Sequence, residues 1–199
     1  MTAEPMDYAP PAEELLRTVV WRNLFLNGTE LCHLSRISDG WLLKGTVVGA
    51  VDEHHPLHAD YAVYCDSQWR TRRVEVNRTI AANSQSLRLS VGSDGVWRSP
   101  DGELPDVKDC VDIDLGLTPA TNTLPIRRLN LSIGQTVSVT AAWAKFPELQ
   151  IRPLPQTYTR IAANRYRYES ATGFSAEIVV DDVALVALYP QGWERIASA

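Results

Sequence analysis

The stretch Cys110-Val-Asp-Ile-Asp-Leu-Gly-Leu-Thr-Pro-Ala-Thr-Asn-Thr-Leu-Pro-Ile-Arg-Arg-Leu129 combines β-branched residues with closely spaced charges. Its first part predicts a strand over residues 110–115, because valine and isoleucine alternate there with polar residues. Successive side chains of a strand point to opposite faces, so Asp112 and Asp114 share one face with Cys110. The sequence thus predicts a β fold that carries a pair of carboxylates on one strand.

The second part of the stretch predicts a turn and another strand. Prolines at 119 and 125 fix φ and cannot donate to a ladder, and the Thr and Asn side chains can bond the backbone locally. Arg127 and Arg128 then stand at the start of a strand predicted over residues 126–131. If the two strands pair, the arginines lie close enough to the two aspartates to interact.

The pattern on either side of this stretch is β almost throughout. Turn signals such as Asn27-Gly28 and Asp94-Gly95 separate short runs of alternating residues, which indicates an antiparallel sandwich, barrel or roll with little helix. The predicted strands are 17–25, 30–38, 40–51, 59–66, 69–80, 84–92, 95–98, 110–115, 126–131, 135–144, 149–153, 156–162, 165–169, 174–180 and 184–189.

Length and composition indicate one globular domain. The chain has 199 residues, of which 45% are hydrophobic and 22% charged, as in an ordinary folded protein. Residues 1–11 are acidic and proline-rich, and we expect a disordered tail there. The loop-like stretch 99–109 does not divide the rest, because the strands on both sides of it need partners. We therefore expect a single domain over residues 12–199.

Charge and hydropathy exclude several classes of partner. The formal net charge is −5, which disfavours nucleic-acid binding. No apolar run reaches the roughly 18 residues of a membrane span, and the N-terminus lacks the features of a signal peptide. Three distant cysteines (Cys32, Cys65 and Cys110) show neither zinc spacing nor a disulfide framework. These features indicate a cytoplasmic protein without stable membrane insertion.

Three predicted strands have one strongly charged face. Arg70 and Arg72 alternate with Trp69 on one of them, and the other two strands are 110–115 and 165–169. On strand 165–169 the charged residues are Arg165, Arg167 and Glu169, and the aromatic residues are Tyr166 and Tyr168. Two interpretations stay open: a solvated outer face, or an inward network in which opposite charges neutralise one another. The charged and the aromatic side chains of one strand cannot face the same space, because they alternate. We favour the charged side chains as the functional ones.

Catalytic chemistry is weakly represented. Asp112 or Asp114 with Glu169 could form the carboxylate pair of a hydrolase acting on a glycosidic or ester bond, and Asp112 with Glu169 is the better pair because the two come from different strands. Nearby arginines would lower both pKa values and so disfavour a general acid. The histidines of Glu53-His-His-Pro-Leu-His58 lie in a turn without metal-ligand spacing. We expect neither a metal nor a cofactor, and the residues favour a binding protein over an enzyme.

An ordered set of motifs resembles the bacterial putative glycolipid-binding family, formerly a domain of unknown function. The motifs are Trp69-Arg-Thr-Arg72, Asp94-Gly-Val-Trp97, Cys110-Val-Asp-Ile-Asp114, Thr118-Pro-Ala-Thr-Asn-Thr-Leu-Pro-Ile-Arg-Arg128, Tyr166-Arg-Tyr168 and Tyr189-Pro190. The resemblance runs from Trp21 to Arg195 and implies a spiral β-roll, one long curled antiparallel sheet distantly similar to lipoprotein-carrier folds. Ala120 departs from it, since a larger aromatic residue is expected there.

These observations lead to one functional hypothesis with two alternatives. We expect non-catalytic binding of a small amphipathic molecule, specifically a glycolipid, in the concave face of the curled sheet. The alternatives are the hydrolase and a structural domain whose arginine and aspartate network has no ligand. The oligomeric state stays open. The candidate ligand-binding residues are Arg70, Arg72, Asp112, Asp114, Arg127, Arg128, Arg165, Arg167, Glu169, Trp69, Trp97, Tyr166 and Tyr168.

Overall fold

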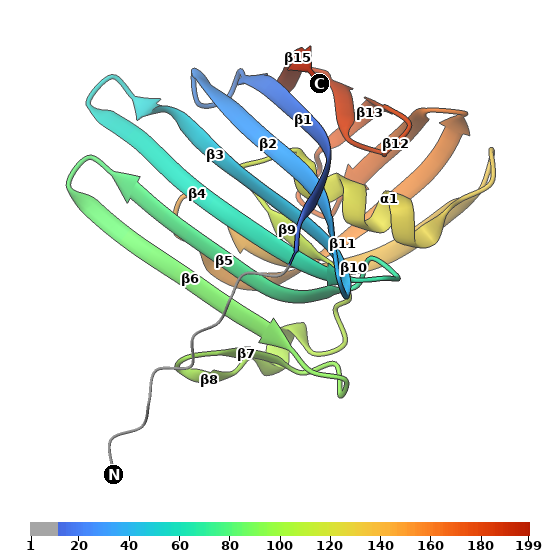
Figure 1. Ribbon diagram of the computed structural model, residues 1–199, viewed down its shortest axis with the longest axis horizontal. Coiled ribbons are helices and arrows are strands. Elements are labelled where there is room, and N and C mark those ends of the chain that lie inside the picture. The colour runs from blue at the N-terminus through green and yellow to red at the C-terminus, as the bar shows by residue number, and fades with distance from the viewer. Residues whose placement is uncertain (1–11) are drawn as a thin grey trace.

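The computed structural model describes residues 12–199, whose strands form one continuous sheet, as Figure 1 shows. The predicted disordered tail, 1–11, lies outside these residues. The strands are β1 (Glu14–Asn23), β2 (Gly28–Ile37), β3 (Gly40–Asp52), β4 (His55–Asp66), β5 (Thr71–Ile80), β6 (Asn83–Val91), β7 (Trp97–Ser99), β8 (Gly102–Glu103), β9 (Ile113–Leu115), β10 (Thr136–Lys145), β11 (Gln150–Ala162), β12 (Arg165–Ser170), β13 (Ser175–Val180), β14 (Val186–Tyr189) and β15 (Trp193–Ser198). The helical segments are η1 (Pro105–Val107), η2 (Ala120–Asn122) and α1 (Thr123–Leu129).

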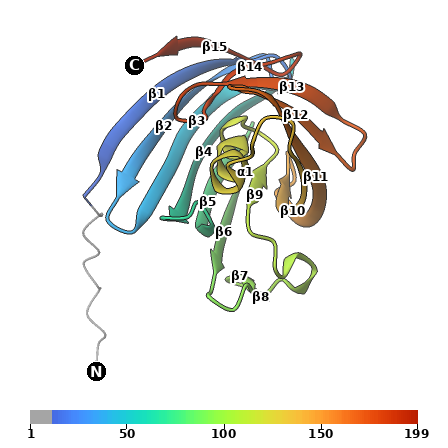
Figure 2. The same cartoon turned by 90° about the vertical axis from the view of Figure 1, so that its right-hand side faces the viewer.

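The strand order is β8-β7-β6-β5-β4-β3-β2-β1-β15-β14-β13-β12-β11-β10-β9. Most neighbours in the chain are thus antiparallel neighbours in the sheet, and β1 pairs with β15 in its middle. Within the described chain, only β9 and β10 pair in parallel. The edge strands β8 and β9 do not pair with each other, so the sheet is curled but not closed (Figure 2). The predicted all-β curled sheet is confirmed.

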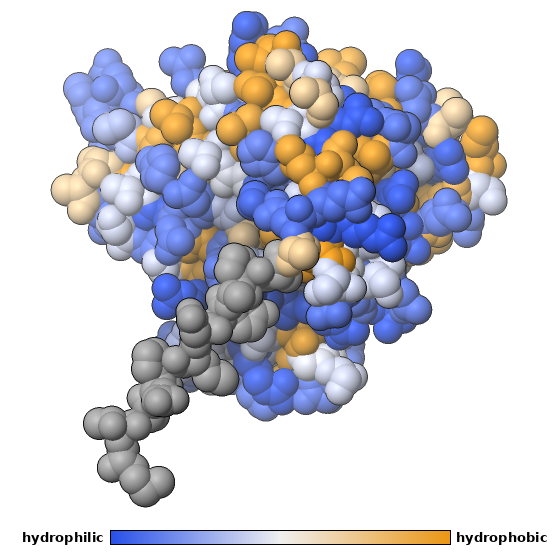
Figure 3. All heavy atoms as spheres, in the orientation of Figure 1, coloured by the Kyte–Doolittle hydropathy of each residue, from blue (hydrophilic) through white to orange (hydrophobic). Residues whose placement is uncertain are grey.

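The inner face of the curl carries the hydrophobic core. In β4, every second residue from Leu57 to Cys65 is buried, as strand alternation requires. Burying one such aliphatic or aromatic side chain stabilises the fold by about 1.5–3 kcal/mol. On the face seen in Figure 3, hydrophilic residues predominate, and hydrophobic ones form small scattered groups. The sheet therefore buries hydrophobic side chains on its concave side and exposes mostly polar ones on the face seen in Figure 3.

The concave side is occupied by residues 117–129, which we call the plug segment. Figure 2 shows α1 inside the curl, between the walls formed by β4–β5 and β10–β12. Leu117, Ala120 and Leu124 have no exposed surface. The prediction of a strand over 126–131 is therefore wrong, because most of those residues belong to α1 or to the turn that ends it.

Local chemistry explains why this segment is helical. Pro125 lies in the first turn of α1, where a backbone N–H has no helical partner to lose. The helix ends at Asn130, whose φ of 43° is left-handed and whose N–H donates to the Ile126 carbonyl. Seven residues are too few for helical periodicity to stand out from a short apolar run. Tertiary burial of Leu124 and Ile126 then decides the conformation.

Other departures from the predicted strands have similar local causes. The strand predicted over residues 110–115 is shorter in the structure, where β9 begins only at Ile113. The predicted strands 149–153 and 156–162 are the single strand β11, and its ladder with β12 begins at Gln156. Pro153 and Pro155 precede that ladder, so their missing N–H groups interrupt no bond to β12. The sequence pattern did not reveal β15.

Candidate functional site

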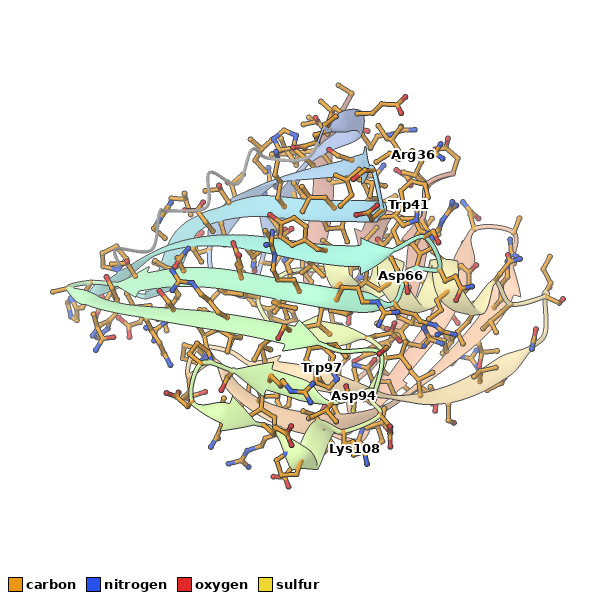
Figure 4. The ribbon with its side chains drawn as sticks, turned by 60° about the horizontal axis from the view of Figure 1, so that its bottom comes forward. Arg36, Trp41, Asp66, Asp94, Trp97 and Lys108 are labelled. Carbon is orange, nitrogen blue, oxygen red and sulfur yellow. The ribbon has the colours of Figure 1, made fainter. Side chains whose placement is uncertain are left out.

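Two hollows lie at opposite ends of the plug segment. The first, of about 890 Å³, lies where β5 begins, beside the turn after β6 and the last turn of α1, and we call it the arginine groove. Figure 4 shows Asp66 and Asp94 at this end of the sheet. The lining residues are Ser67, Gln68, Trp69, Arg70, Thr71, Arg72, Val91, Gly92, Ser93, Asp94, Gly95, Asp109, Cys110, Val111, Arg127 and Arg128.

A carboxylate organises the turn that presents Trp69 and Arg70 to the groove. The Asp66 Oδ1 atom accepts hydrogen bonds from the backbone N–H groups of Gln68 and Arg70, each at 2.9 Å. Its Oδ2 atom accepts from the Arg72 guanidinium at 2.7 Å. Trp69 takes a left-handed φ of 65° in this turn. Asp66 therefore fixes the backbone from which both groove residues project.

The predicted alternation along 69–76 fails at this turn. Strand β5 begins at Thr71, and a β-bulge shifts its register against β4, so that Cys65 faces Thr71 while Tyr64 faces Arg73. Arg72 is the extra residue of the bulge. Thr71 and Val74 are consequently both buried although they stand three residues apart.

An aromatic stack supports the groove. The Trp69 ring lies on the Trp41 ring, with centroids 4.5 Å apart and planes at 12°. The Arg127 guanidinium lies 5.2 Å from the Trp69 ring, and that of Arg36 lies 6.0 Å from the Trp41 ring. Figure 4 shows Trp41 and Arg36 at this end of the sheet. Two tryptophans thus lie between two guanidinium groups, an arrangement favoured by the ring quadrupole.

The cations of the groove differ in their partners. Arg72 is paired with Asp66 and Arg128 with Asp112. Among residues 12–199, Arg70 and Arg127 have no carboxylate partner.

Two carboxylates also line the groove. Asp94 is engaged by Arg98 at 2.8 Å, and Asp109 makes no ion pair with a described residue. Two free guanidinium groups and one free carboxylate leave the groove with a net positive charge.

Asp112 and Arg128 form an internal brace. The Arg128 Nε atom donates to Asp112 Oδ1 at 3.0 Å, and its Nη2 atom donates to Oδ2 at 2.5 Å. The Asp112 side chain is 3% exposed, and burial raises its pKa although the Arg128 contacts lower it. This bidentate pair connects α1 to the chain just before β9.

The second hollow, of about 180 Å³, lies at the other end of the plug segment, and we call it the aromatic pocket. Asp114 belongs to its lining, and its Oδ2 atom accepts a hydrogen bond of 2.5 Å from Gln156 Nε2. Burial raises the pKa of Asp114 to about 6, and the Gln156 bond opposes this. The lining residues are Phe25, Asp114, Leu115, Gly116, Thr118, Asn122, Trp143, Leu154, Tyr168, Ser170, Thr172, Phe174, Tyr189 and Trp193.

The prediction that the charged face of β12 is the functional, inward face is wrong. Arg165, Arg167 and Glu169 are exposed on the outer face, whereas Tyr166 and Tyr168 are buried on the inner face. The aromatic residues of this strand point inward because they pack against the core. The charged set is therefore the solvated face.

The remaining predicted residues lie in four places: the arginine groove, a hollow beside it, the aromatic pocket and the core. Trp69, Arg70, Arg72, Arg127 and Arg128 meet in the arginine groove, and Tyr166 lies in an adjoining hollow of about 660 Å³ that shares Trp69 and Arg127. Asp114 and Tyr168 meet in the aromatic pocket. Trp97 has no exposed surface and donates its indole N–H to the Cys110 carbonyl at 2.8 Å.

Ala120, which departs from the expected aromatic residue, is fully buried in the plug segment and lines neither hollow.

The proposed carboxylate pair of the hydrolase alternative is not formed. Asp112 is buried on the inner side of the sheet, and Glu169 is exposed on the outer face of β12. Within the described chain, no group of three or more His, Cys, Asp or Glu residues is arranged to hold a metal ion. No helix of residues 12–199 has the length and hydropathy needed to cross a membrane.

Sequence reasoning missed most of the aromatic pocket. Phe25, Trp143, Phe174, Tyr189 and Trp193 come from five separate segments, and no local pattern connects them. Gln156 had a usable signal, because it shares one face of β11 with the buried Leu154 and Tyr158, and a buried polar side chain needs a partner.

Comparison with known proteins agrees with this architecture. A crystal structure of a DUF1089 family protein from Pseudomonas aeruginosa is similar over 98% of both chains, with 28% sequence identity and a TM-score of 0.73. A β-barrel-like protein of the DUF1849 domain of unknown function from Brucella abortus shares the fold, with 9% identity and a TM-score of 0.59 over 92% of this chain and 97% of the other. The comparison with curated proteins found no match. A family model described as "Putative glycolipid-binding" matches residues 18–195, and the chain therefore belongs to this family.

Proposed function

We propose that the protein binds an amphipathic ligand, a glycolipid, without catalysing a reaction, and that the arginine groove holds the polar head group. The observation that carries the proposal is the presence of Arg70 and Arg127 in the groove without carboxylate partners among the described residues. A guanidinium group presents a fork of donors that matches phosphate or carboxylate geometry. Such a head group would compensate the positive charge of the groove.

Size and shape support the same assignment. A hollow of about 890 Å³ lies within the range of small-molecule sites, and the Trp41–Trp69 stack gives it a rigid wall. The plug segment fills the interior of the curl, which leaves the lipid chain at the surface. The adjoining hollow contains the apolar side chains of Ile126, Val180 and Ala184, against which the first methylene groups could pack.

A scaffold without a ligand is the second candidate function. The observation in its favour is the filling of the concave side by the plug segment, together with the internal pairing of Asp112 and Arg128. In that case the arginine groove would be an ordinary solvated depression.

A binding experiment separates the two candidates. Native mass spectrometry before and after organic extraction would identify a co-purified lipid, and the extracted protein would be titrated with an acidic glycolipid in detergent. We expect Arg70→Ala with Arg127→Ala to weaken binding by at least about 100-fold, because each charge-assisted hydrogen bond contributes about 1.5–3 kcal/mol. The matched control replaces Arg165 and Arg167 on the outer face and should bind like the native protein. Absence of binding, or equal affinity of both double variants, would contradict the proposal.

A further inference from the structure

The aromatic pocket has one charged residue in its lining. That residue is Asp114, and the lining contains no lysine, arginine or histidine. Within residues 12–199, Asp114 forms no ion pair, and its Oδ1 atom accepts no hydrogen bond. Its carboxylate is mostly ionised at neutral pH, because its pKa is about 6. The pocket therefore holds a negative charge that no neighbouring cation among the described residues compensates.

The polar groups around Asp114 do not neutralise its charge. Gln156 Nε2 donates to Asp114 and also lies 3.1 Å from the Tyr168 hydroxyl. A single amide donor orients the carboxylate but supplies no positive charge. A cation placed beside the Oδ1 atom of Asp114 would therefore be attracted by a charge that no protein group neutralises.

The walls of the pocket add to the negative potential. The rings of Phe174 and Tyr189 are parallel, with centroids 5.8 Å apart and planes at 4°. Trp193 stands at 78° to Tyr189 and at 80° to Phe25, with both centroid distances 5.1 Å. Aromatic faces carry negative partial charge and attract cations, quaternary ammonium groups in particular. A ring cluster next to an unpaired carboxylate is thus complementary to an organic cation.

We propose that the aromatic pocket binds a small organic cation, with its ammonium group between the Asp114 carboxylate and the aromatic rings. A volume of about 180 Å³ suits a methylated or primary ammonium head rather than a whole lipid. A neutral sugar ring could stack on the same rings, but it would leave the charge of Asp114 uncompensated. The pocket and the arginine groove share no lining residue, so this proposal does not depend on the function proposed for the groove.

Titration of the full-length protein with tetramethylammonium chloride tests the proposal, with sodium chloride and glucose as reference solutes and calorimetry as the readout. We expect tetramethylammonium to bind and glucose not to bind. Asp114→Asn keeps the shape and an acceptor for Gln156 but removes the charge, and it should weaken binding at least about tenfold. Glu169→Gln, the same kind of charge removal on the outer face of the sheet, should bind like the native protein.

A second variant and the pH dependence keep the test independent of folding. Phe174→Leu removes one aromatic face, and we expect binding to weaken about fivefold with an unchanged circular dichroism spectrum.

Affinity should fall as pH drops below about 6, when Asp114 takes up a proton. The other titratable groups near it are Tyr158, Tyr168 and Tyr189, whose pKa values burial raises further above neutrality, and Asp112, which is paired with Arg128. Failure of tetramethylammonium to bind, binding that Asp114→Asn leaves unchanged, or preferential binding of glucose would each overturn the proposal.

Discussion

At the scale of single residues, Glu30 is the most unusual group in the core. Its side chain has no exposed surface, and its Oε1 atom accepts hydrogen bonds from Tyr61 at 2.7 Å and from Thr118 at 2.5 Å. The Oε2 atom has no partner among the described residues. Burial raises the pKa of Glu30 from 4.5 to about 7, although both hydrogen bonds lower it. The folded protein therefore holds this proton where an unfolded chain would release it.

This raised pKa predicts that stability falls as pH rises. Between about pH 4.5 and 7, Glu30 is protonated in the folded state and ionised in the unfolded state, so the folded state binds more protons. We expect the free energy of unfolding to decrease by about 2 kcal/mol from pH 5 to pH 8 through this group alone. Urea unfolding at both pH values would measure it. Glu30→Gln should reduce the slope, and an equal slope in that variant would assign the effect to other groups.

At the scale of elements, one ion pair joins α1 to the chain that leads into β9. The Asp112–Arg128 pair joins its last turn to the residue before β9, the short edge strand. Arg127, one residue earlier, lies over Trp69 on the opposite wall. Consecutive helical residues point about 100° apart, so the two neighbouring arginines reach different partners. In a strand, Arg127 and Arg128 would point to opposite faces of the sheet and would make different contacts.

Arg128→Ala should therefore be strongly destabilising. It leaves the Asp112 carboxylate buried without its cation, which costs about 3–5 kcal/mol when one partner of a buried pair is removed. Chemical denaturation would measure the loss. Arg165→Ala is the control, because Arg165 is exposed and forms no ion pair with a described residue, so its effect should stay within about 0.5 kcal/mol. Similar stabilities for the two variants would show that the brace contributes little.

At the scale of the whole molecule, the first and last strands of the described chain meet in the middle of the sheet. β15 pairs with β1 on one side and with β14 on the other. Nearly all other pairings join strands that follow one another in the chain. The β1–β15 ladder is thus the long-range contact that joins the two halves of the sheet.

This arrangement predicts a large effect of a small truncation. A chain that ends at Tyr189 lacks β15 and exposes unpaired backbone on β1 and β14, so we expect loss of cooperative thermal unfolding. A chain that ends at Ile196 keeps the pairing of Trp21 with Arg195 and should still unfold cooperatively. Differential scanning calorimetry would compare the two. A cooperative transition in the shorter chain would mean that the halves of the sheet fold independently.

The sequence by itself determined the class of fold and part of the arginine groove. Alternating patterns are encoded locally, because each strand buries one face, and turn residues such as Asp94-Gly95 mark its ends. Trp69, Arg70 and Arg72 were identifiable because they are neighbours in one segment, and Arg127 and Arg128 because they are adjacent.

Tertiary structure alone decided the conformation of 123–129, the inner face of β12 and the aromatic pocket. Leu124 and Ile126 become helical because the curl offers them a core to enter, which a seven-residue pattern cannot encode. The sequence does not show whether the charged or the aromatic face of β12 points inward. In the structure the two tyrosines pack into the core and the charged residues are exposed. The rings around Asp114 come from distant segments that meet only because the sheet curls, so their proximity is a property of the fold and not of any stretch of the chain.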